Sequence, residues 1–365
     1  MVPRIFITGG TGLIGGDYLH LLANKYSSWD IAVLVRSREK ASIIANVYPQ
    51  VEIVFGTLDN IAFLEQESKK ADVVLNFANC DHEPAALAIV RGVAQRDRLG
   101  TVIHTSGAKI IAWEMEANPD TWGYYMPRRY NDWVEVGRLT SLPTADDPEP
   151  SGDGIILPNW AAHRDVDMAI LHAFRDHPTV VRTAIVCPPT VYGPSRFPIF
   201  TRSIQLPRLL QIVLRRRRAF TINKNANRWN MIHTQDLSAL YLLLTEAAVD
   251  GLSGNLWNEH GYYFAENGGF AWGEIIHEIA RVGYAKGLLD SDIPEELSNA
   301  EVSRFWKGGQ MNVSSTSLGE AQRARELLGW NPEKHSLLED IGRTMEAEAA
   351  AMGLLTKIPD NQGSD

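Results

Sequence analysis

Three glycines near the N-terminus are the first residues whose type and spacing could do chemistry. Gly9, Gly12 and Gly15 stand three residues apart in ITGGTGLIGG, after the apolar run RIFIT and before a segment with helical periodicity. In this context one glycine permits a tight turn, one lets the backbone approach a pyrophosphate, and one lets a helix pack closely on a strand. The anion then lies at the positive helix N-terminus. The sequence therefore predicts a dinucleotide bound by this loop, through Gly9, Thr11, Gly12, Leu13, Ile14 and Gly15.

Two arginines bear on which dinucleotide is bound. The second apolar run, in DIAVLVRSREK, ends at Arg36, and Arg38 follows two residues later. An acid at this place holds the ribose hydroxyls of NAD, whereas a basic residue suits the 2′-phosphate of NADP. The two arginines favour NADP as the cofactor. NAD remains the alternative, in which both side chains are merely exposed.

A sheet must position these residues. Helical patterns alternate with apolar, β-rich runs, which predict strands at residues 4–8, 31–35, 51–55, 73–77, 102–105 and 180–186. Such alternation indicates βαβ units and a parallel sheet covered on both faces. We therefore expect an α/β fold with a Rossmann-type doubly wound parallel sheet and a smaller, mixed C-terminal substrate lobe.

The same pattern suggests domain limits. Residues 1–193 are expected to form the dinucleotide-binding domain. Residues 194–365 are expected to form mainly the substrate lobe, with 229–250 returning to the first domain. Residues 113–150 interrupt the alternation and carry several aromatic side chains. We interpret them as an insertion that could cover a site, ending in the loop sequence LPTADDPEPSGDG.

Composition excludes several classes of function. The formal net charge of −9 argues against nucleic-acid binding, which normally uses a basic surface. Two cysteines, Cys80 and Cys187, are too few for a disulfide framework or a cysteine-built zinc site, so no metal site is expected. No apolar run approaches the roughly 20 residues that span a bilayer, and no signal peptide precedes the first strand. These features predict a cytoplasmic protein without membrane contact.

Six sequence blocks together resemble a known family. The blocks are TGGTGLIG, DVVLNFAN, VIHTSG, CPPTVYGP, NMIHTQDL and ELLGWNP, in this order between residue 4 and about residue 340. Their ordered set resembles the extended short-chain dehydrogenases/reductases of the NAD-dependent epimerase/dehydratase type. The resemblance implies that Leu58, Ala78 and Asn79 line the cofactor, and that Pro188 and Val191 pass beside the nicotinamide. It also implies a homodimer.

The active-site motif of the family is missing. Relatives carry YxxxK on a helix, where the lysine lowers the tyrosine pKa and the phenol exchanges a proton with the substrate. The corresponding segment, residues 158–174, contains neither tyrosine nor lysine. Two registers fit the motif: His163 with Asp167, or Asn159 with His163. The first would make an acid/base dyad at i and i+4, and its alternative is a surface ion pair beside Arg164.

Other polar residues complete the predicted site. In HTSG, Thr105 and Ser106 are candidates to bind a substrate oxygen, and Gly107 stands where many relatives keep a serine. YxxxR occurs at Tyr124 with Arg128, and again one residue later, within the insertion. This gives a weaker candidate for a displaced catalytic pair. Asp236 is expected to cap a helix that starts at Leu237.

Aromatic residues suggest the substrate class. Nucleotide-sugar enzymes of the family usually hold a phosphate with an arginine, where this chain has Trp229. An indole cannot form the hydrogen bonds that an arginine makes to a phosphate, so we expect an apolar or aromatic small molecule as the substrate. Its expected contacts are Trp160, Tyr192, Trp229 and Tyr125. Two functions remain open. One is an NADP(H)-dependent enzyme that reduces, epimerises or dehydrates a small hydroxyl or carbonyl compound. The other is a redox-silent relative: an isomerase, lyase or cyclase, or an NADP-sensing regulator.

Overall fold

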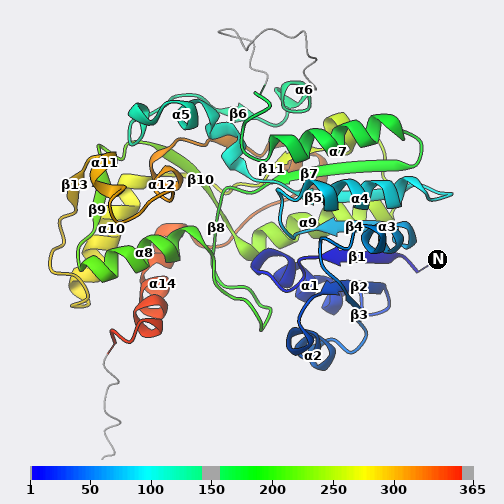
Figure 1. The fold of residues 1–365 in the computed structure, drawn as a ribbon, viewed down its shortest axis with the longest axis horizontal. Coiled ribbons are helices and arrows are strands. Elements are labelled where there is room, and N and C mark those ends of the chain that lie inside the picture. The colour runs from blue at the N-terminus through cyan, green and yellow to red at the C-terminus, as the bar shows by residue number, and fades with distance from the viewer. Residues whose placement is uncertain (1, 142–156, 356–365) are drawn as a thin grey trace, which may run out of the picture.

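A seven-stranded parallel sheet organises the N-terminal half of the chain (Figure 1). The computed structural model describes residues 2–141 and 157–355, so the predicted loop LPTADDPEPSGDG lies outside the described residues. The strand order is β11-β7-β5-β4-β1-β2-β3, and every neighbouring pair is parallel. The strands are β1 (Arg4–Thr8), β2 (Asp30–Val35), β3 (Glu52–Phe55), β4 (Val73–Asn76), β5 (Gly100–Thr105), β7 (Val181–Cys187) and β11 (Tyr262–Phe264).

This order is that of a doubly wound Rossmann sheet, so the predicted fold class is confirmed. The six predicted strands are present within one or two residues of their expected limits. The seventh strand, β11, was not predicted. Its three residues, YYF, are too few to show a pattern, and only pairing with β7 makes them a strand.

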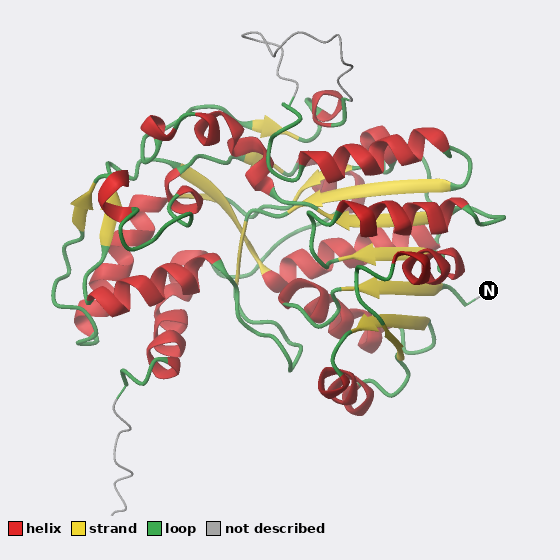
Figure 2. Cartoon of the chain, viewed as in Figure 1, coloured by secondary structure: helices red, strands yellow, loops and turns green. Residues whose placement is uncertain are grey.

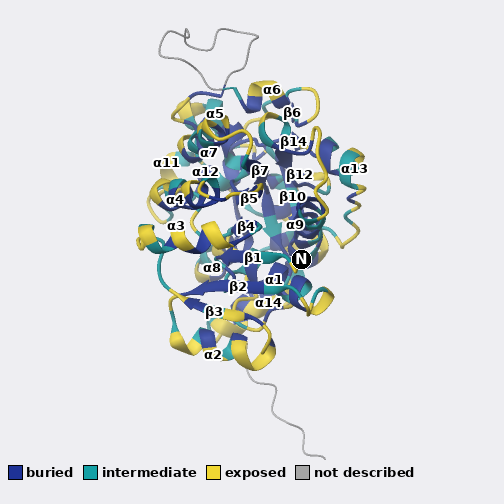
Figure 3. Cartoon of the chain, turned by 90° about the vertical axis from the view of Figure 1, so that its right-hand side faces the viewer, coloured by how far each residue is buried: buried dark blue, intermediate teal, exposed yellow. Residues whose placement is uncertain are grey.

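Helices cover both faces of the sheet (Figure 3). The helices α3, α4 and α7 pack side by side on one face, and α1 packs against α9 on the other. Residues on β4, β5 and β7 are buried throughout because both faces are covered. These helices, with the neighbouring α2, are α1 (Leu13–Lys25), α2 (Arg38–Val47), α3 (Ile61–Lys70), α4 (Glu83–Ala94), α7 (Arg164–Asp176) and α9 (Thr234–Val249).

The segment after β5 runs along the edge of the sheet. It contains short elements: η1 (Ala108–Ala112), α5 (Trp113–Ala117), η2 (Pro119–Thr121), β6 (Tyr130–Asn131) and α6 (Val136–Leu139). Strand β6 pairs with β14 (Gly319–Glu320) near the other end of the chain. The buried carboxylate of Asp132 accepts hydrogen bonds from the backbone N–H groups of Phe264, Gln322 and Arg323. The segment is therefore held to β11 and to the C-terminal region.

A second hydrophobic cluster forms the smaller lobe (Figure 2). Its buried side chains come mainly from α8, α10 and α14, with small mixed sheets beside them. The described elements of this part are β8 (Thr190–Tyr192), α8 (Gln205–Arg216), β9 (Phe220–Ile222), β10 (Arg228–His233), β12 (Gly269–Ala271), α10 (Trp272–Ala285), β13 (Glu295–Leu297), α11 (Asn299–Val302), α12 (Met311–Ser314) and α14 (Leu337–Ala351). Two further elements pack on the large sheet: η3 (Asn258–His260) against β7, and α13 (Gln322–Leu328) against β11. Within residues 2–141 and 157–355, no helix is both long enough and apolar enough to cross a bilayer.

Two predicted helix starts are wrong. Helix α7 begins at Arg164, and the residues before it form turns, so His163 precedes the helix instead of lying within it. Helix α9 begins at Thr234, and the His233 side chain caps it by accepting from Gln235 N. Asp236 instead accepts a hydrogen bond from Lys334 N and ties the C-terminal region to α9.

Candidate functional site

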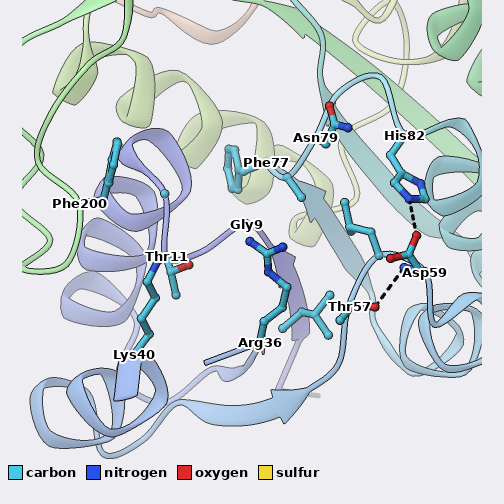
Figure 4. A pocket seen from close by; sticks show the side chains of 14 residues that line it. Gly9, Thr11, Arg36, Lys40, Thr57, Asp59, Phe77, Asn79, His82 and Phe200 are labelled. Carbon is cyan, nitrogen blue, oxygen red and sulfur yellow. Dashed lines mark hydrogen bonds and ion pairs between the residues drawn. The ribbon is translucent and has the colours of Figure 1, made fainter. Parts of the chain in front are cut away.

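A cavity of about 540 Å³ opens at the carboxyl ends of the first strands (Figure 4). In a doubly wound sheet, ligands bind at this edge. We call it the glycine-loop cavity. Its lining includes seven residues predicted from sequence and seven others: Gly9, Thr11, Gly12, Arg36, Leu58, Ala78 and Asn79, with Leu34, Lys40, Thr57, Asp59, Phe77, His82 and Phe200.

The glycines of the loop fit a dinucleotide. Gly9 has a φ of +71°, and a Cβ there would lie 2.5 Å from the backbone carbon of Phe77. A Cβ on Gly15 would lie 2.5 Å from the Gly9 carbonyl oxygen, so only glycine lets α1 approach the loop this closely. Gly12 is the N-cap of α1 and offers no capping side chain, which leaves the first N–H groups of the helix for an anion.

Basic residues lie at the end of β2 beside this loop. Figure 4 shows the Arg36 guanidinium extending into the cavity, and Lys40 lines the same wall from α2. Thr57 lines the wall opposite, at the end of β3. Arg38 does not line the cavity, because its guanidinium lies over the Phe55 ring, 5.7 Å from the centroid. The sequence prediction of Arg38 is corrected in favour of Lys40.

A second cavity of about 460 Å³ continues the first, with which it shares Gly12, Phe77 and Phe200. We call it the His163 cavity. It lies between the sheet and the smaller lobe and is lined mostly by apolar groups. The predicted residues on its wall are Leu13, Ile14, Gly15, His163, Pro188, Val191 and Trp229. Pro189, within the predicted stretch from Pro188 to Val191, lines it too. Residues that sequence reasoning missed are Ala108, Lys109, Ser203, Ile204, Gln205 and Asn312.

His163 is held in a strained conformation on this wall. Its φ of 67° lies in the left-handed region, which costs a non-glycine residue free energy and is typical of functional positions. Its Nδ1 donates a hydrogen bond to Asp81 Oδ1 at 2.5 Å, and Cys80 Sγ lies 3.5 Å from the same nitrogen. The side chain of His163 is 16% exposed and that of Asp81 is 54% exposed. Asp81 therefore fixes the ring orientation and leaves Nε2 without a hydrogen-bond partner among the described residues.

The charge of His163 follows from the same contacts. Burial disfavours the imidazolium, but the hydrogen bonds to Asp81 and Cys80 outweigh burial and raise the His163 pKa to about 10. The same hydrogen bond lowers the Asp81 pKa. The ring is therefore positively charged at neutral pH and can donate a proton.

The three side chains also offer a potential metal site. Cys80, Asp81 and His163 bring one ligand atom each to within 4.8 Å of one another. However, the 2.5 Å between Nδ1 and Oδ1 is a hydrogen-bond distance. Two ligands of one zinc ion, each about 2 Å from the metal, stand farther apart in a tetrahedral site. We therefore describe the trio as an acid/base cluster, and the expectation of no metal stays a prediction.

Gly107 explains how the imidazole fits. A Cβ at this position would lie 2.9 Å from His163 Nε2. The serine that many relatives keep here would collide with the ring. Because Gly107 has no side chain, the His163 ring can lie directly against its backbone.

The predicted His163–Asp167 dyad does not form. Asp167 is fully buried in the first turn of α7, where its Oδ2 accepts from Ser106 Oγ and from the Tyr262 hydroxyl. Burial raises the Asp167 pKa to about 6, although the hydrogen bonds from Tyr262 and Ser106 work against this shift. Thr105 pairs with the Tyr241 hydroxyl. Ser106, Thr105 and Asp167 are buried and line neither of the two cavities described above.

Most predicted aromatic contacts also lie elsewhere. Trp160 is 54% exposed and packs edge-on against Trp113. Tyr125 is exposed, and Tyr192 is buried with its hydroxyl donating to the His335 carbonyl. Of the predicted substrate residues, only Trp229 lines the His163 cavity.

The alternative pairs are not supported either. Asn159 is exposed and lies outside the cavity, and Arg128 forms an ion pair with Glu114. Tyr124 is exposed on the same segment. The hydrogen-bond partner of His163, Asp81, was missed, and the signal for it was the polar run NCDH, residues 79–82 in the loop that follows β4, where parallel strands present ligand-binding loops.

Comparisons with known proteins agree with this geometry. A model described as the NAD dependent epimerase/dehydratase family matches residues 5–111. Oxidase ucsJ of an Acremonium species is 30% identical, over 97% of this chain and 100% of its own length. UDP-glucose 4-epimerase of Thermotoga maritima superposes with a TM-score of 0.61 at 14% identity, covering 96% of this chain and 99% of its own. For dTDP-glucose 4,6-dehydratase of Bacillus anthracis, in complex with NAD, the TM-score is 0.61 at 14% identity, covering 97% and 98%. The chain belongs to the NAD-dependent epimerase/dehydratase family of extended short-chain dehydrogenases/reductases.

Proposed function

We propose that this chain is an NADP(H)-dependent oxidoreductase of a small, mainly apolar carbonyl or hydroxyl compound, with His163 as its acid/base. The observation that carries the proposal is the His163–Asp81 hydrogen bond on the wall of the second cavity. A charged imidazole with one nitrogen held by a carboxylate and the other beside an apolar cavity is suited to proton transfer.

The choice of NADP depends on the end of β2. Arg36 and Lys40 line the glycine-loop cavity, and no carboxylate stands at the strand end where NAD-binding sheets carry one. Asp59, on the opposite wall, is hydrogen-bonded by His82 at 3.1 Å. Two cations suit a 2′-phosphate, with which they form charge-assisted hydrogen bonds.

The chemistry divides between cofactor and chain. When bound, the dinucleotide supplies a hydride to a carbonyl carbon or accepts one from a hydroxyl-bearing carbon. In reduction, His163 donates the proton that converts the carbonyl oxygen into a hydroxyl group, and water then reprotonates the ring. Asp81 holds Nδ1 throughout and orients Nε2. Because the His163 pKa is about 10, the ring is charged before reduction starts, which favours this direction at neutral pH.

The wall of the His163 cavity supports an apolar substrate. Pro188, Pro189, Val191 and Trp229 contribute carbon surface. The Trp229 indole N–H is already used, since it donates to the Ser315 carbonyl at 2.7 Å. The ring is therefore fixed, and only its apolar surface remains for a ligand.

The test combines cofactor binding with turnover. We expect tighter binding of NADPH than of NADH by isothermal titration. We also expect NADPH oxidation, followed by absorbance, with members of a panel of aromatic ketones and aldehydes. His163→Gln should remove turnover by about 100-fold or more while NADPH binding is retained. His172→Gln, which changes an exposed histidine on the helix α7 that follows His163, is the matched control.

A redox-silent role is the second candidate. The observation that favours it is that α7 (Arg164–Asp176) contains neither tyrosine nor lysine. NADPH binding without oxidation by any panel compound would support this role and contradict the oxidoreductase. Failure to bind either dinucleotide would contradict both.

A further inference from the structure

A third cavity extends the His163 cavity away from the glycine loop. Its volume is about 250 Å³, and it shares Ile204, Gln205 and Asn312 with the His163 cavity. The rest of its wall comes from the first turn of α8 and from the loop before α12, through Arg208, Trp306, Lys307, Gly308, Gly309 and Val313. We call it the Arg208 cavity. Through these shared residues the two cavities adjoin, and together they form a cleft that runs from the sheet into the smaller lobe.

The charges along this cleft all have one sign. Among residues 2–141 and 157–355, no aspartate or glutamate lines either the His163 cavity or the Arg208 cavity, although the chain carries a formal net charge of −9. Lys109, near His163, is balanced by Glu116 at 3.2 Å. Within the part of the chain that the structure describes, Arg208 and Lys307 have no carboxylate partner. A cleft lined by one sign of charge attracts ligands of the opposite sign.

We propose that the Arg208 cavity binds an anionic group of the substrate, a carboxylate or a phosphate, while the apolar body of the substrate occupies the His163 cavity. This inference rests on the proposed function, which makes the His163 cavity the reaction site. A guanidinium offers a planar pair of donors that matches either anion, and an ammonium adds a point charge. The Trp306 ring offers apolar surface next to both cations.

The position of the cations gives them a role in specificity. They lie beyond Gln205 and Asn312, at the opposite end of the cleft from His163. A substrate anchored there would present its far end to His163, so chain length and charge would both select the substrate. The expected preference for an anionic over a neutral substrate is modest, because Arg208 and Lys307 are exposed and water screens exposed ion pairs.

The test measures binding, which does not require turnover. The probes are 5-oxo-5-phenylpentanoate, its methyl ester, and a phenyl ketone of the same length that ends in a phosphate. Each is titrated by calorimetry into protein saturated with NADP⁺, which has no hydride to transfer to a ketone. We expect at least one of the two anions to bind about tenfold more tightly than the ester, which corresponds to about 1.4 kcal/mol. The preferred anion identifies the group.

Variants locate the effect. Arg208→Gln should reduce the preference to about threefold, and the double variant with Lys307→Gln should abolish it. Arg215→Gln, an exposed arginine at the other end of α8, should retain it and is the matched control. Unchanged NADPH affinity and melting temperature would show that the variants fold.

The outcomes separate this inference from the proposed function. Equal binding of ester and anions, no binding of either anion, or a preference that survives the double variant would overturn the anionic site. If His163-dependent NADPH oxidation persists in that case, the proposed oxidoreductase function is retained and only the anionic site is rejected. A preference that depends on Arg208, without any NADPH oxidation, would support the anionic site and contradict the oxidoreductase.

Discussion

Replacing Asp81 by asparagine tests the role assigned to His163. An asparagine oxygen can still accept the Nδ1 hydrogen bond, so the substitution removes the charge and keeps the contact. In the wild type the pKa of His163 is raised to about 10, because the hydrogen bonds to Asp81 and Cys80 outweigh burial. Without the carboxylate, burial still disfavours the imidazolium. We therefore expect the pKa to fall to about 6.5, the ordinary value, or below.

The change in protonation follows directly. At pH 8.5 a pKa of about 10 leaves about 97% of the ring charged, whereas a pKa of about 6.5 leaves about 1%. Reduction by Asp81→Asn should therefore fall about 100-fold or more at pH 8.5, and much less at pH 6, where a pKa of about 6.5 gives a loss of less than about twofold. Asp97→Asn, an exposed carboxylate just before β5 at the opposite edge of the sheet, should behave as the wild type.

Two assays check this prediction. The first is the pH profile of NADPH oxidation with an active panel compound. The second needs no substrate: NMR of histidine-labelled protein, with His163→Gln to assign the signal. We expect no titration of His163 between pH 6 and 9 in the wild type, and a midpoint at or below about 6.5 in Asp81→Asn. A wild-type midpoint near 6.5, or identical profiles for both proteins, would refute the reasoning.

The same hydrogen bond has a consequence for stability. The folded pKa of His163 lies above its unfolded value, so folding binds the proton more tightly. This contribution to the free energy of unfolding is fully present below about pH 6.5 and is lost as the pH rises through about 10. Asp81→Asn should lack it.

Three further predictions concern the cofactor and the core. Arg36→Gln should weaken NADPH binding about tenfold by calorimetry with little effect on NADH, whereas Arg38→Gln should leave both unchanged if the cation–π contact is its only role. The pKa of Asp167 is raised to about 6 by burial, so its contribution to stability falls as the pH rises from about 4 to above 6. In Asp167→Asn, the decrease in the free energy of unfolding over this pH range, measured by urea unfolding, should therefore be smaller by ~3 kcal/mol. An unchanged dependence of that free energy on pH would contradict the raised pKa. Gly15→Ala should abolish dinucleotide binding and cost ~1–3 kcal/mol in the same assay, while Gly342→Ala, with open space around it, should not destabilise the protein.

The dinucleotide half of the site could be predicted because its signals are local. Gly9, Gly12 and Gly15 belong to one strand-turn-helix unit. The glycines that this turn requires are only three residues apart, so a short stretch of sequence is enough to recognise it. Arg36 sits at a strand end, and a parallel sheet places all such ends at one edge. For these residues, the apolar periodicity of the strands and the glycine-rich turn were sufficient to predict that they lie at the carboxyl edge of the sheet.

The half of the candidate site around His163 depended on contacts between distant segments. His163 and Asp81 are 82 residues apart, and they meet only because the loop after β4 and the turn before α7 pack together. A helical reading of residues 158–174 paired His163 with Asp167, but the left-handed backbone at His163 turns the ring away from the helix that follows. Gly107 then provides the space that the ring fills.

The sequence by itself determined six of the seven strands of the parallel sheet and the glycine loop, because apolar periodicity and glycine spacing act over a few residues. Only the tertiary structure decided which polar side chains face the cavity and which are buried behind it. Ser106 and Asp167 look catalytic in the sequence and are buried together, whereas Asp81 and Lys40 were overlooked and lie at the site. The physical reason is that the partner of a polar side chain is chosen by packing between segments, which no local pattern records.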